Sequence, residues 1–413
     1  MTGGGYDGDP SLNDAVRGKG LSLEFQPIVT LDSGAIVGFE ALARWPDLGG
    51  AGPNQVFAHA RALGHDGRLD QQCVTEAIGA ALDARLPRQT LITINYEPGT
   101  PYPGSLAPAL LARARALSLA FELTERSMLA HPRTLLSTVS AMRRDGFLIA
   151  LDDVGAQPDS LALLDVLRPD IIKLDMGLVQ QKPRQAQART ISAVLAYHER
   201  TGTPILAEGI ETEAHLEHAR ALGATLGQGF KFGRSGPISA VPSVSADWAV
   251  SHPPIRATAR TPYDLAETGP VACRIGRKQV LIALSAHIEA QAGCTADPPI
   301  VLATLQHHRY FSAGTRRRYV ELAEFCPLVT VFGQDLPEHL GSAIRGVALR
   351  PDDPLCEEWT VVALGPQLAV ALIARERPGG ATSSEYDRQF EFVLTYERRV
   401  VTEAAHSLLA RML

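Results

Sequence analysis

The sequence has no apolar run long enough to cross a lipid bilayer, which takes about 20 residues. Its most apolar stretch, 361–374, is interrupted by Gly365, Pro366 and Gln367. The first ten residues, MTGGGYDGDP, lack the basic and apolar regions of a secretory signal peptide. We therefore expect no membrane span and a cytoplasmic location.

Cysteine and positive charge are also scarce. The five cysteines, at positions 73, 273, 294, 326 and 356, include no C-x-x-C pair. An odd, unpaired set predicts buried thiols in a reducing compartment, with neither a disulfide framework nor a zinc site. The 39 Lys and Arg residues are outnumbered by 45 Asp and Glu, which gives a net charge of −6. Because nucleic-acid binders need a basic surface, we expect no DNA partner.

The composition does provide for a folded core, with 45% hydrophobic and 20% charged residues. Between residues 20 and 237, eight strand-like runs alternate with mostly helical connections. The runs are LSLEFQPIV, AIVGFEALARW, LITINYE, LAFELTE, FLIALDDV, DIIKLDM, PILAEGI and TLGQGFKF. This pattern, over about 220 residues, predicts an α/β fold of the (β/α)8 TIM barrel type. A doubly wound open sheet is the alternative.

The segments around this range differ in composition. Residues 1–19 are rich in Gly and Asp and are predicted to be disordered. Residues 238–269 are rich in Pro, Ser and Ala and are predicted to form a linker. Residues 270–413 mix strand-like and helical patterns, which predicts a smaller α/β domain. It should close on an amphipathic helix whose apolar side chains recur at helical spacing: Val393, Tyr396, Val400, Ala404 and Leu408.

Polar residues cluster where the barrel strands should end. They are Glu40, Asn95, Glu122, Asp152, Asp153, Lys173, Asp175, Glu208, Glu211 and Gln228. The carboxyl ends of barrel strands converge on one face, where these carboxylates would repel one another unless cations neutralised them. Oxygen ligands favour Mg²⁺ or Mn²⁺, and a two-metal site suits displacement at phosphorus. The plain alternative is that each acid caps a helix or lies in a loop.

These residues carry a resemblance to a known family. Glu40-Ala41-Leu42, inside FQPIVTLDSGAIVGFEALARW, resembles the signature of the EAL family of cyclic di-GMP phosphodiesterases. The match continues in the family's order and spacing. It runs through Ile94-Asn95, Glu122-Leu123-Thr124-Glu125, Asp152-Asp153, Lys173-Leu174-Asp175, Ala207-Glu208-Gly209-Ile210-Glu211 and Gln228-Gly229.

The resemblance implies a modified TIM barrel that hydrolyses cyclic di-GMP to linear pGpG at a two-metal Mg²⁺ or Mn²⁺ site. It implies that Glu40, Asn95, Glu122 and Asp152 hold one metal, and that Asp152 and Asp153, with Glu208 close by, serve the second. It makes Lys173, Glu208 and Glu40 the catalytic residues, with Lys173 orienting or helping to deprotonate the attacking water. It also implies that the nucleotide is contacted by Gln26, Arg44, Asp175 and Gln228, and that supporting roles belong to Glu125 and Glu211. For Arg44, a structural ion pair is the alternative.

Two departures from the family pattern bear on activity. The loop after the paired aspartates usually reads Phe-Gly, then Thr or Ala, then Gly-Tyr-Ser-Ser, whereas residues 154–160 read VGAQPDS. Gln157 replaces a glycine of the family pattern, which could take a positive φ. Pro158 fixes its own φ and also restrains the backbone of Gln157. Glu97 also adds an acid near the site. An alternative is therefore a catalytically impaired EAL domain that binds cyclic di-GMP as an effector; a purely structural barrel would not need the intact acid set.

The last third of the chain resembles the DICT sensory domain, which occurs beside cyclic di-GMP turnover domains. The resemblance is carried by LATLQHHRYFSAGTRRRYVELAEFCPLVTVFG and WTVVALGPQLAVALIARER. It implies regulation of the barrel by a small-molecule or protein signal whose identity the residues do not give. The resemblance to EAL proteins also implies a homodimer.

Overall fold

The computed structural model describes residues 10–49, 52–97, 108–124, 132–155, 158–181, 184–238, 244, 260–341, 343–377 and 388–412. The chain divides into two compact units. The first combines Met1–Gln157 with Pro169–His252, and the second combines Pro158–Arg168 with Pro253–Leu413. Pro158–Arg168 thus packs with the second unit, although it falls inside the predicted barrel range of 20–237.

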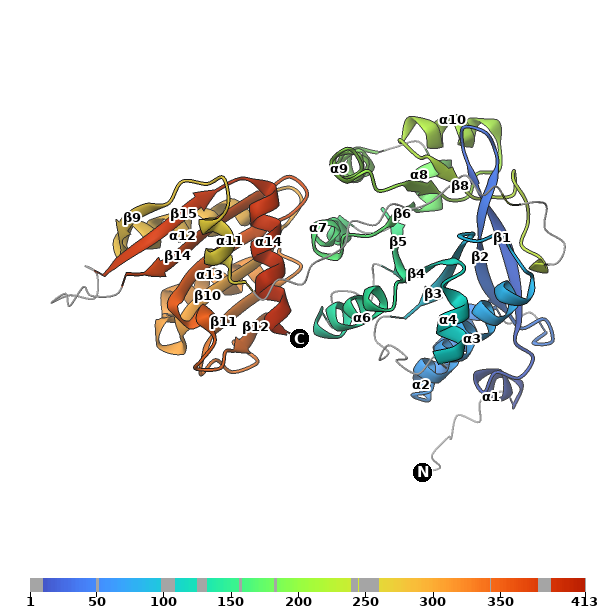
Figure 1. Cartoon of the computed structure of the whole chain (residues 1–413), viewed down its shortest axis with the longest axis horizontal. Coiled ribbons are helices and arrows are strands. Elements are labelled where there is room, and N and C mark those ends of the chain that lie inside the picture. Colours follow the sequence, from blue (N-terminus) through green and yellow to red (C-terminus); the bar gives the residue numbers. More distant parts are fainter. Residues whose placement is uncertain are drawn as a thin grey trace, which may run out of the picture. The chain divides into compact units, whose positions relative to one another are not determined.

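The first unit is a closed eight-stranded barrel, as the alternating strand-like runs predicted (Figure 1). Its strands are β1 (Ser22–Thr30), β2 (Ile36–Arg44), β3 (Leu91–Tyr96), β4 (Ser118–Thr124), β5 (Leu148–Val154), β6 (Ile171–Leu174), β7 (Ile205–Ala207) and β8 (Leu226–Gly227). Its helices are α1 (Pro10–Val16), α2 (Pro53–Ala62), α3 (Asp66–Asp83), α4 (Pro108–Ala114), α6 (Pro132–Arg144), α8 (Met176–Gln180), α9 (Gln185–Thr201) and α10 (Glu213–Ala221). The doubly wound alternative is therefore wrong.

Strand β1 modifies the barrel because it runs antiparallel to both of its neighbours, β2 and β8. All the other neighbouring pairs are parallel. The connection 31–35 between β1 and β2 is too short for the crossover that a parallel pair needs. The expectation that all strand carboxyl ends meet on one face is therefore wrong for β1.

The structure describes the N-terminal segment from residue 10 onward. Helix α1 lies within the range 1–19 that the sequence predicted to be disordered, while residues 1–9 fall outside the described residues. Ala15 and Val16 are buried and belong to the same apolar cluster as Trp45 and Val56. This packing stabilises a helix that composition alone does not favour.

The second unit contains a seven-stranded mixed sheet in the order β12-β11-β10-β13-β14-β15-β9. These strands are β9 (Arg274–Arg277), β10 (Ile300–His307), β11 (Val329–Gln334), β12 (Ile344–Ala348), β13 (Glu358–Leu364), β14 (Ala369–Glu376) and β15 (Gln389–Thr395). Its helices are α7 (Leu164–Leu167), α11 (Pro262–Glu267), α12 (Lys278–Ala292), α13 (Ala313–Ala323) and α14 (Arg398–Leu409), and α11 falls inside the predicted linker 238–269.

The closing helix and the cysteines differ from expectation. The closing helix α14 begins at Arg398, so Val393 lies in β15 and Tyr396 is exposed between the two elements. Apolar residues of β15 and of α14 happen to recur at helical spacing in the sequence, which made them look like one helix. The predicted burial of all five thiols is also wrong. Cys73 and Cys326 are buried and Cys356 is half-buried, but Cys273 and Cys294 are exposed.

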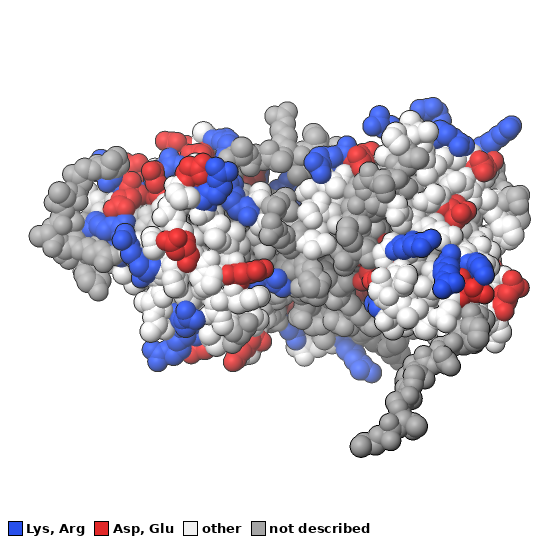
Figure 2. All heavy atoms as spheres, turned by 90° about the horizontal axis from the view of Figure 1, so that it is seen from below, with Lys and Arg blue, Asp and Glu red and all other residues white. Residues whose placement is uncertain are grey.

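The charge pattern matches the balanced composition. In the view of Figure 2, acidic and basic side chains of the described residues are interspersed on both units. No helix within the described ranges has the length and apolar character needed to cross a bilayer.

Candidate functional site

The floor of the site is an apolar layer inside the barrel to which every strand contributes. Its members are Ile28, Val37, Leu91, Ala120, Leu148, Ala150, Ile171, Leu206 and Leu226. Side chains two residues apart on a strand face the same side. Glu122, Asp152, Lys173, Glu208 and Gln228 each follow a member of the layer by two residues. The sequence therefore stacks a polar layer directly on the apolar one.

Strand β1 contributes to the polar layer in the opposite chain direction. Gln26 precedes Ile28 by two residues and pairs with Glu40 of β2 in the strand register. The Gln228 amide donates to Gln26 Oε1 at 2.9 Å, and the Gln26 amide donates to the Gly233 carbonyl at 3.3 Å. Because β1 is antiparallel, a residue from the middle of the strand reaches the same layer as residues from the ends of the others.

Lys173 lies at the centre of the polar layer and is only 1% exposed. Its Nζ is 2.7 Å from Glu122 Oε1, 2.8 Å from Glu208 Oε1 and 2.9 Å from Asp152 Oδ1. Glu40 Oε1 is further away, at 3.8 Å. The ammonium thus offsets part of the charge of the four carboxylates around it.

The pKa values of this cluster show that one ammonium does not balance it. Burial raises the pKa of Glu122 well above its usual range, and Glu40 adds to the shift against the opposing effect of Lys173. Burial likewise raises the pKa of Glu208 to about 8, although Lys173 opposes it. Burial by itself would lower the pKa of Lys173, but Asp152 and the other three carboxylates reverse this and raise it. With all four carboxylates ionised, the site would therefore hold excess negative charge, which the raised pKa values of Glu122 and Glu208 oppose.

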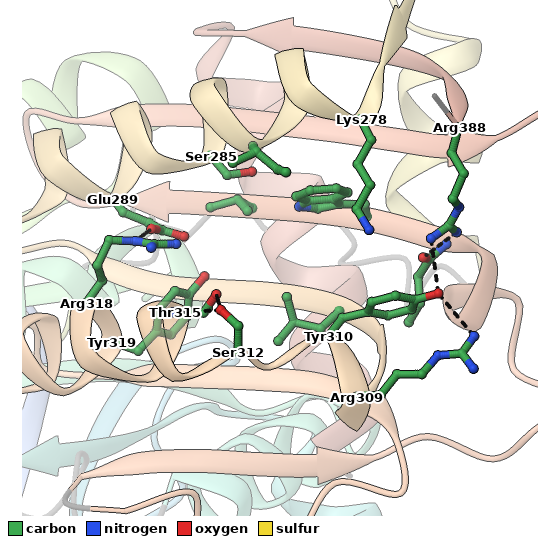
Figure 3. Close-up of a pocket in the computed structure, with 15 residues that line it drawn as sticks. Lys278, Ser285, Glu289, Arg309, Tyr310, Ser312, Thr315, Arg318, Tyr319 and Arg388 are labelled. Atoms are coloured by element: carbon green, nitrogen blue, oxygen red, sulfur yellow. Dashed lines mark hydrogen bonds and ion pairs between the residues drawn. The ribbon is translucent and has the colours of Figure 1, made fainter. Parts of the chain in front are cut away.

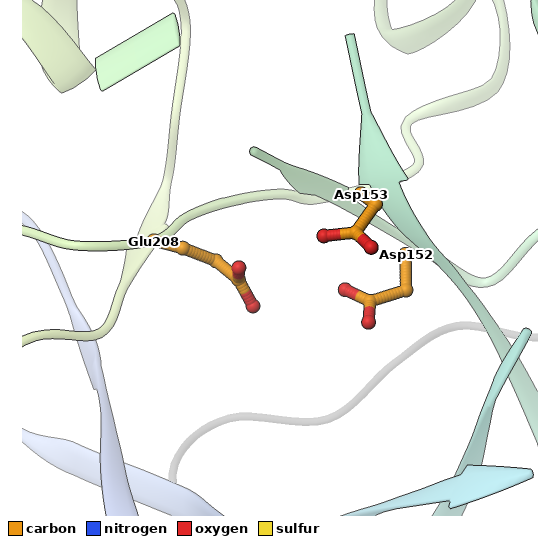
Figure 4. A group of neighbouring side chains, drawn as sticks. All are labelled: Asp152, Asp153 and Glu208. Atoms are coloured by element: carbon orange, nitrogen blue, oxygen red, sulfur yellow. The ribbon is translucent and has the colours of Figure 1, made fainter. Parts of the chain in front are cut away.

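A β-bulge brings two adjacent aspartates to the same site. The register between β5 and β6 shifts between Leu151 and Val154, and Asp153 takes a positive φ of 56°. An ordinary strand would send Asp152 and Asp153 to opposite faces, and a bulge redirects side chains. Asp152, Asp153 and Glu208 each offer a carboxylate oxygen, and these three atoms lie within 4.8 Å of one another (Figure 4).

Glu40 connects the carboxylate cluster to the amide side chains. Its Oε2 accepts from the Gln228 amide at 2.5 Å, and its Oε1 accepts from the Asn95 amide at 3.2 Å. Asn95 itself is exposed at the end of β3. These two amides fix the orientation of the Glu40 carboxylate.

Four other predicted site residues lie outside this cluster or cannot be placed. Arg44 Nε donates to Glu24 Oε2 at 3.0 Å, which is the ion pair weighed as the alternative for this residue. Asp175 caps α8 by accepting from the Gly177 amide at 2.8 Å. Glu211 is exposed. Glu125 lies outside the described residues.

Sequence reasoning missed Glu24, which also accepts from the Ser235 hydroxyl at 2.6 Å. Its signal was the two-residue spacing from Gln26, which puts both side chains on one face of β1. The additional acid Glu97 is paired with Arg61 at 3.6 Å. In the altered loop, Ala156 and Gln157 fall outside the described residues.

The donor set fits a hard divalent cation. Five carboxylates and one amide supply oxygen ligands, the type that Mg²⁺ and Mn²⁺ prefer. Both carboxylate oxygens of Glu122, and Oδ1 of Asp152, are buried and accept no hydrogen bond of good geometry from the described residues. Glu122 Oε1 and Asp152 Oδ1 instead form ionic contacts with the Lys173 ammonium. Buried carboxylate oxygens that share a single ammonium are ones that a bound cation would also satisfy.

Comparison with protein families gives two matches. The model described as "EAL domain" matches residues 10–235, more than half of the chain. The model described as "Sensory domain in DIguanylate Cyclases and Two-component system" (DICT) matches residues 263–377.

Curated relatives each match a little more than half of the chain. The probable cyclic di-GMP phosphodiesterase PdeB of Escherichia coli is 32% identical over 237 residues, covering 55% of this chain and 45% of the relative. The cyclic di-GMP phosphodiesterase RocR of Pseudomonas aeruginosa is 29% identical over 240 residues, covering 55% and 61%. An uncharacterized protein of Azorhizobium caulinodans is 32% identical over 247 residues, covering 55% and 33%. The chain thus spans less than two thirds of each relative.

Among solved structures, the complex titled "PaMucR Phosphodiesterase, c-di-GMP complex" is 26% identical with a TM-score of 0.47. It covers 55% of this chain and 96% of that chain. A manganese/cy-diGMP complex of Klebsiella pneumoniae BlrP1 is 29% identical with a TM-score of 0.47, covering 53% and 56%.

Proposed function

This chain belongs to the EAL domain family, and on that premise we propose that its barrel hydrolyses cyclic di-GMP to linear pGpG with Mg²⁺ or Mn²⁺. The observation that carries the proposal is the buried cluster in which Glu122, Asp152 and Glu208 converge on Lys173. A cluster serving stability alone would do better with apolar side chains, because burying charge is costly. The relatives PdeB and RocR, named as cyclic di-GMP phosphodiesterases, support the substrate.

The metal-binding residues follow from the donor set and its placement. In the proposal, Glu40, Asn95, Glu122 and Asp152 hold one cation. Asp152, Asp153 and Glu208, whose oxygens lie within 4.8 Å of one another, hold the other. When bound, the two ions would acidify the attacking water and offset the charge that develops at phosphorus.

Lys173 and Glu208 handle protons in this proposal. The raised pKa of Lys173 keeps it an ammonium, a donor able to orient a water molecule beside Glu122 and Asp152. Hydrolysis places the hydroxyl of that water on phosphorus, breaks one ester bond and delivers a proton to the departing sugar oxygen. Burial raises the pKa of Glu208 to about 8 in the metal-free site, and binding of the cation would displace this proton and leave a carboxylate.

In the proposal, the nucleotide is bound by Gln26, Arg44, Asp175 and Gln228. Gln26 and Gln228 are joined by a hydrogen bond and present amide groups suited to a base edge. Arg44 is held by Glu24 through Nε, and its planar guanidinium remains a good partner for phosphate. Asp175 keeps its helix-capping contact, so its proposed substrate role is through the position of α8.

Regulation by the C-terminal domain is part of the proposal and is supported by chain connectivity. Pro158–Arg168, which starts five residues after Asp153, belongs to the second unit. Within that unit, Asp165 Oδ2 accepts from Arg398 Nη1 at 2.6 Å, and the Asp165 carbonyl lies 3.0 Å from His406 Nε2. A change in the second unit would therefore act on the chain directly after the paired aspartates. The homodimer, the cytoplasmic location and the absence of a DNA partner stay predictions.

The second candidate function is binding of cyclic di-GMP without turnover. It is favoured by one observation, the replacement of the family's glycine-containing loop by VGAQPDS. Proline and glutamine at these positions restrict the backbone next to Asp153, whose own φ is already positive.

One assay separates the two functions. Purified full-length protein is incubated with cyclic di-GMP and either Mg²⁺ or Mn²⁺, and the nucleotides are separated by chromatography. Formation of pGpG that stops in excess EDTA supports the enzyme. Recovery of unchanged cyclic di-GMP from a protein that binds it in calorimetry supports the effector.

A further inference from the structure

The second unit contains a cavity of about 350 Å³ that the barrel chemistry does not use (Figure 3). It is bounded by α12, the sheet face of β10 and β13, the 3₁₀ turn His308–Tyr310 and α13. Its volume is at the lower end of the range for small-molecule sites. Its lining combines basic, hydroxyl and apolar side chains in separate regions.

One end of the cavity is basic. Figure 3 shows Lys278, Arg309 and Arg388 gathered around Tyr310. The Tyr310 hydroxyl accepts from Arg309 Nη2 and from Arg388 Nη1, both at 3.1 Å, while Lys278 Nζ lies 4.9 Å from the Tyr310 ring centre. Three cations that are distant in the sequence thus converge on one aromatic side chain. Arg388 is further held by the Glu376 carboxylate.

The opposite end is neutral and offers hydroxyl groups. Arg318 Nε donates to the buried Glu289 at 2.6 Å, so this pair cancels its own charge. The Ser285 hydroxyl is buried and has no hydrogen-bond partner among the described residues. Burial and the nearby Glu289 hold the pKa of Tyr319 well above its usual value, so its buried hydroxyl stays protonated. Buried hydroxyls at a cavity wall are available to a ligand.

The wall between the two ends is largely apolar and partly aromatic. It is formed by Ile282, Leu305, Trp359 and Val361. Trp359 is held against Phe390 in an edge-to-face contact with 5.9 Å between ring centres. A fixed aromatic side chain in this position favours a flat, apolar ligand body.

The net charge of the cavity lining determines which charge on the ligand is favoured. Among the lining residues, the cations Lys278, Arg309, Arg318 and Arg388 stand against the single carboxylate Glu289. Even with Glu376 added, cations outnumber carboxylates four to two. A ligand that carries a negative group at the basic end is therefore favoured, and a cationic one is disfavoured.

We propose that this cavity binds a small organic acid with one anionic group and a flat apolar body, and that this is the signal-binding site of the second unit. The acid group contacts Lys278 and Arg309, the body lies along Trp359, and a polar substituent reaches Ser285. The binding site itself stands independently of the phosphodiesterase activity proposed for the barrel.

The direct test is calorimetric titration of full-length protein with 2-naphthoate and with its neutral analogue 2-naphthamide. Both have the same flat body, so only the charge at one end differs. The acid is expected to bind at least about tenfold more tightly than the amide, because hydrogen bonds to charged groups are the stronger ones.

Two variants with matched controls locate the binding. Arg309→Gln is expected to weaken 2-naphthoate binding at least about fivefold, whereas Arg350→Gln, which removes an exposed arginine paired with Asp352, leaves it unchanged. Ser285→Leu fills the cavity and is expected to abolish binding. Ala283→Leu adds the same bulk on the exposed side of α12 and has no effect. Circular dichroism checks that each variant is folded, and Ser285→Ala replaces Ser285→Leu if the latter is not.

Equal affinity for acid and amide, or no binding of either up to about 1 mM, overturns the proposal. So does binding that Ser285→Leu and Arg309→Gln leave intact. Because the readout is heat of binding, failure here leaves hydrolysis by the barrel untouched, and an inactive barrel leaves this test valid.

Discussion

Lys173 Nζ lies 2.7 Å from Oε1 of Glu122, and both side chains are buried inside the barrel. A buried ammonium at this position supplies a positive charge to the same carboxylates that the proposal assigns to metal ions. Asp152 and Glu208 contact the same Nζ atom. In the proposal, the stability of the barrel and its affinity for metal are therefore linked through Lys173.

The first prediction follows from this link. Lys173→Met keeps the length of the side chain but removes its charge, which leaves the surrounding carboxylates without their buried cation. In EDTA, we expect the free energy of unfolding to fall by about 3–5 kcal/mol. Urea titration measures this change.

The matched control is Lys19→Met, which breaks an exposed pair with Asp14 and should cost at most about 1 kcal/mol. Addition of Mg²⁺ or Mn²⁺ should stabilise the Lys173→Met variant more than the wild type, since the cation replaces the lost charge. A variant as stable as wild type in EDTA would contradict the linked role of Lys173.

The second prediction concerns metal affinity. Glu122→Gln removes a proposed ligand whose carboxylate oxygens accept no hydrogen bond of good geometry from the described part of the chain. We expect calorimetry to show Mn²⁺ affinity lowered at least about tenfold, because a neutral amide oxygen is a poorer ligand. Glu213→Gln, at an exposed position paired with Lys231, should bind Mn²⁺ as the wild type does. Undiminished affinity in Glu122→Gln would remove this residue from the metal site.

The third prediction is a pH dependence of the metal-free protein. The pKa of Glu208 rises from its ordinary value of 4.5 to about 8 on folding, chiefly through burial. Between these values the folded state binds more protons than the unfolded state, so stability must fall as pH rises. Each such proton corresponds to about 1.4 kcal/mol per pH unit.

Glu208→Gln cannot titrate, so its stability in EDTA should fall less steeply over this pH window. Glu122, whose pKa is also raised, keeps part of the slope. Urea midpoints measured across the window give the comparison. If the stability of the wild type and of Glu208→Gln fell with pH at the same slope, titration of Glu208 would not be the cause of the pH dependence.

The strand pattern made much of the barrel predictable from the sequence. Short strand-like runs between helical stretches gave the eight strands. Because side chains two residues apart on a strand share a face, Glu122, Asp152 and Lys173 occupy one layer above the apolar one. The direction of each strand in the barrel was harder to predict, because a strand-like run has the same pattern in a parallel and in an antiparallel strand. Only the short connection 31–35 indicated that β1 is antiparallel.

The central place of Lys173 was not predictable from spacing. Strand ends indicated which residues gather, but the contact distances depend on how far a flexible lysine side chain extends between facing carboxylates. The association of Pro158–Arg168 with the second unit was also beyond sequence reasoning. It depends on contacts such as Asp165 with Arg398, which are 233 residues apart in the chain.

The fourth prediction uses that contact. Arg398→Gln weakens the ion pair with Asp165 and should change the basal rate of cyclic di-GMP hydrolysis at least about threefold if the second unit acts through Pro158–Arg168. The neighbouring Arg399 is more exposed and pairs with Glu403 one helical turn away, so Arg399→Gln is the control. Identical rates in the two variants and the wild type would leave the segment without a regulatory role.

The proposed reaction is cleavage of cyclic di-GMP, with divalent metal, at the acid cluster around Lys173. Its most direct test is the rate of pGpG formation, with saturating Mn²⁺, by wild type, Asp152→Asn and the exposed control Asp83→Asn. We expect pGpG from the wild type and from Asp83→Asn at equal rates, and a rate at least about a hundredfold lower from Asp152→Asn. Equal rates from wild type and Asp152→Asn, or no pGpG from folded wild type, would contradict it.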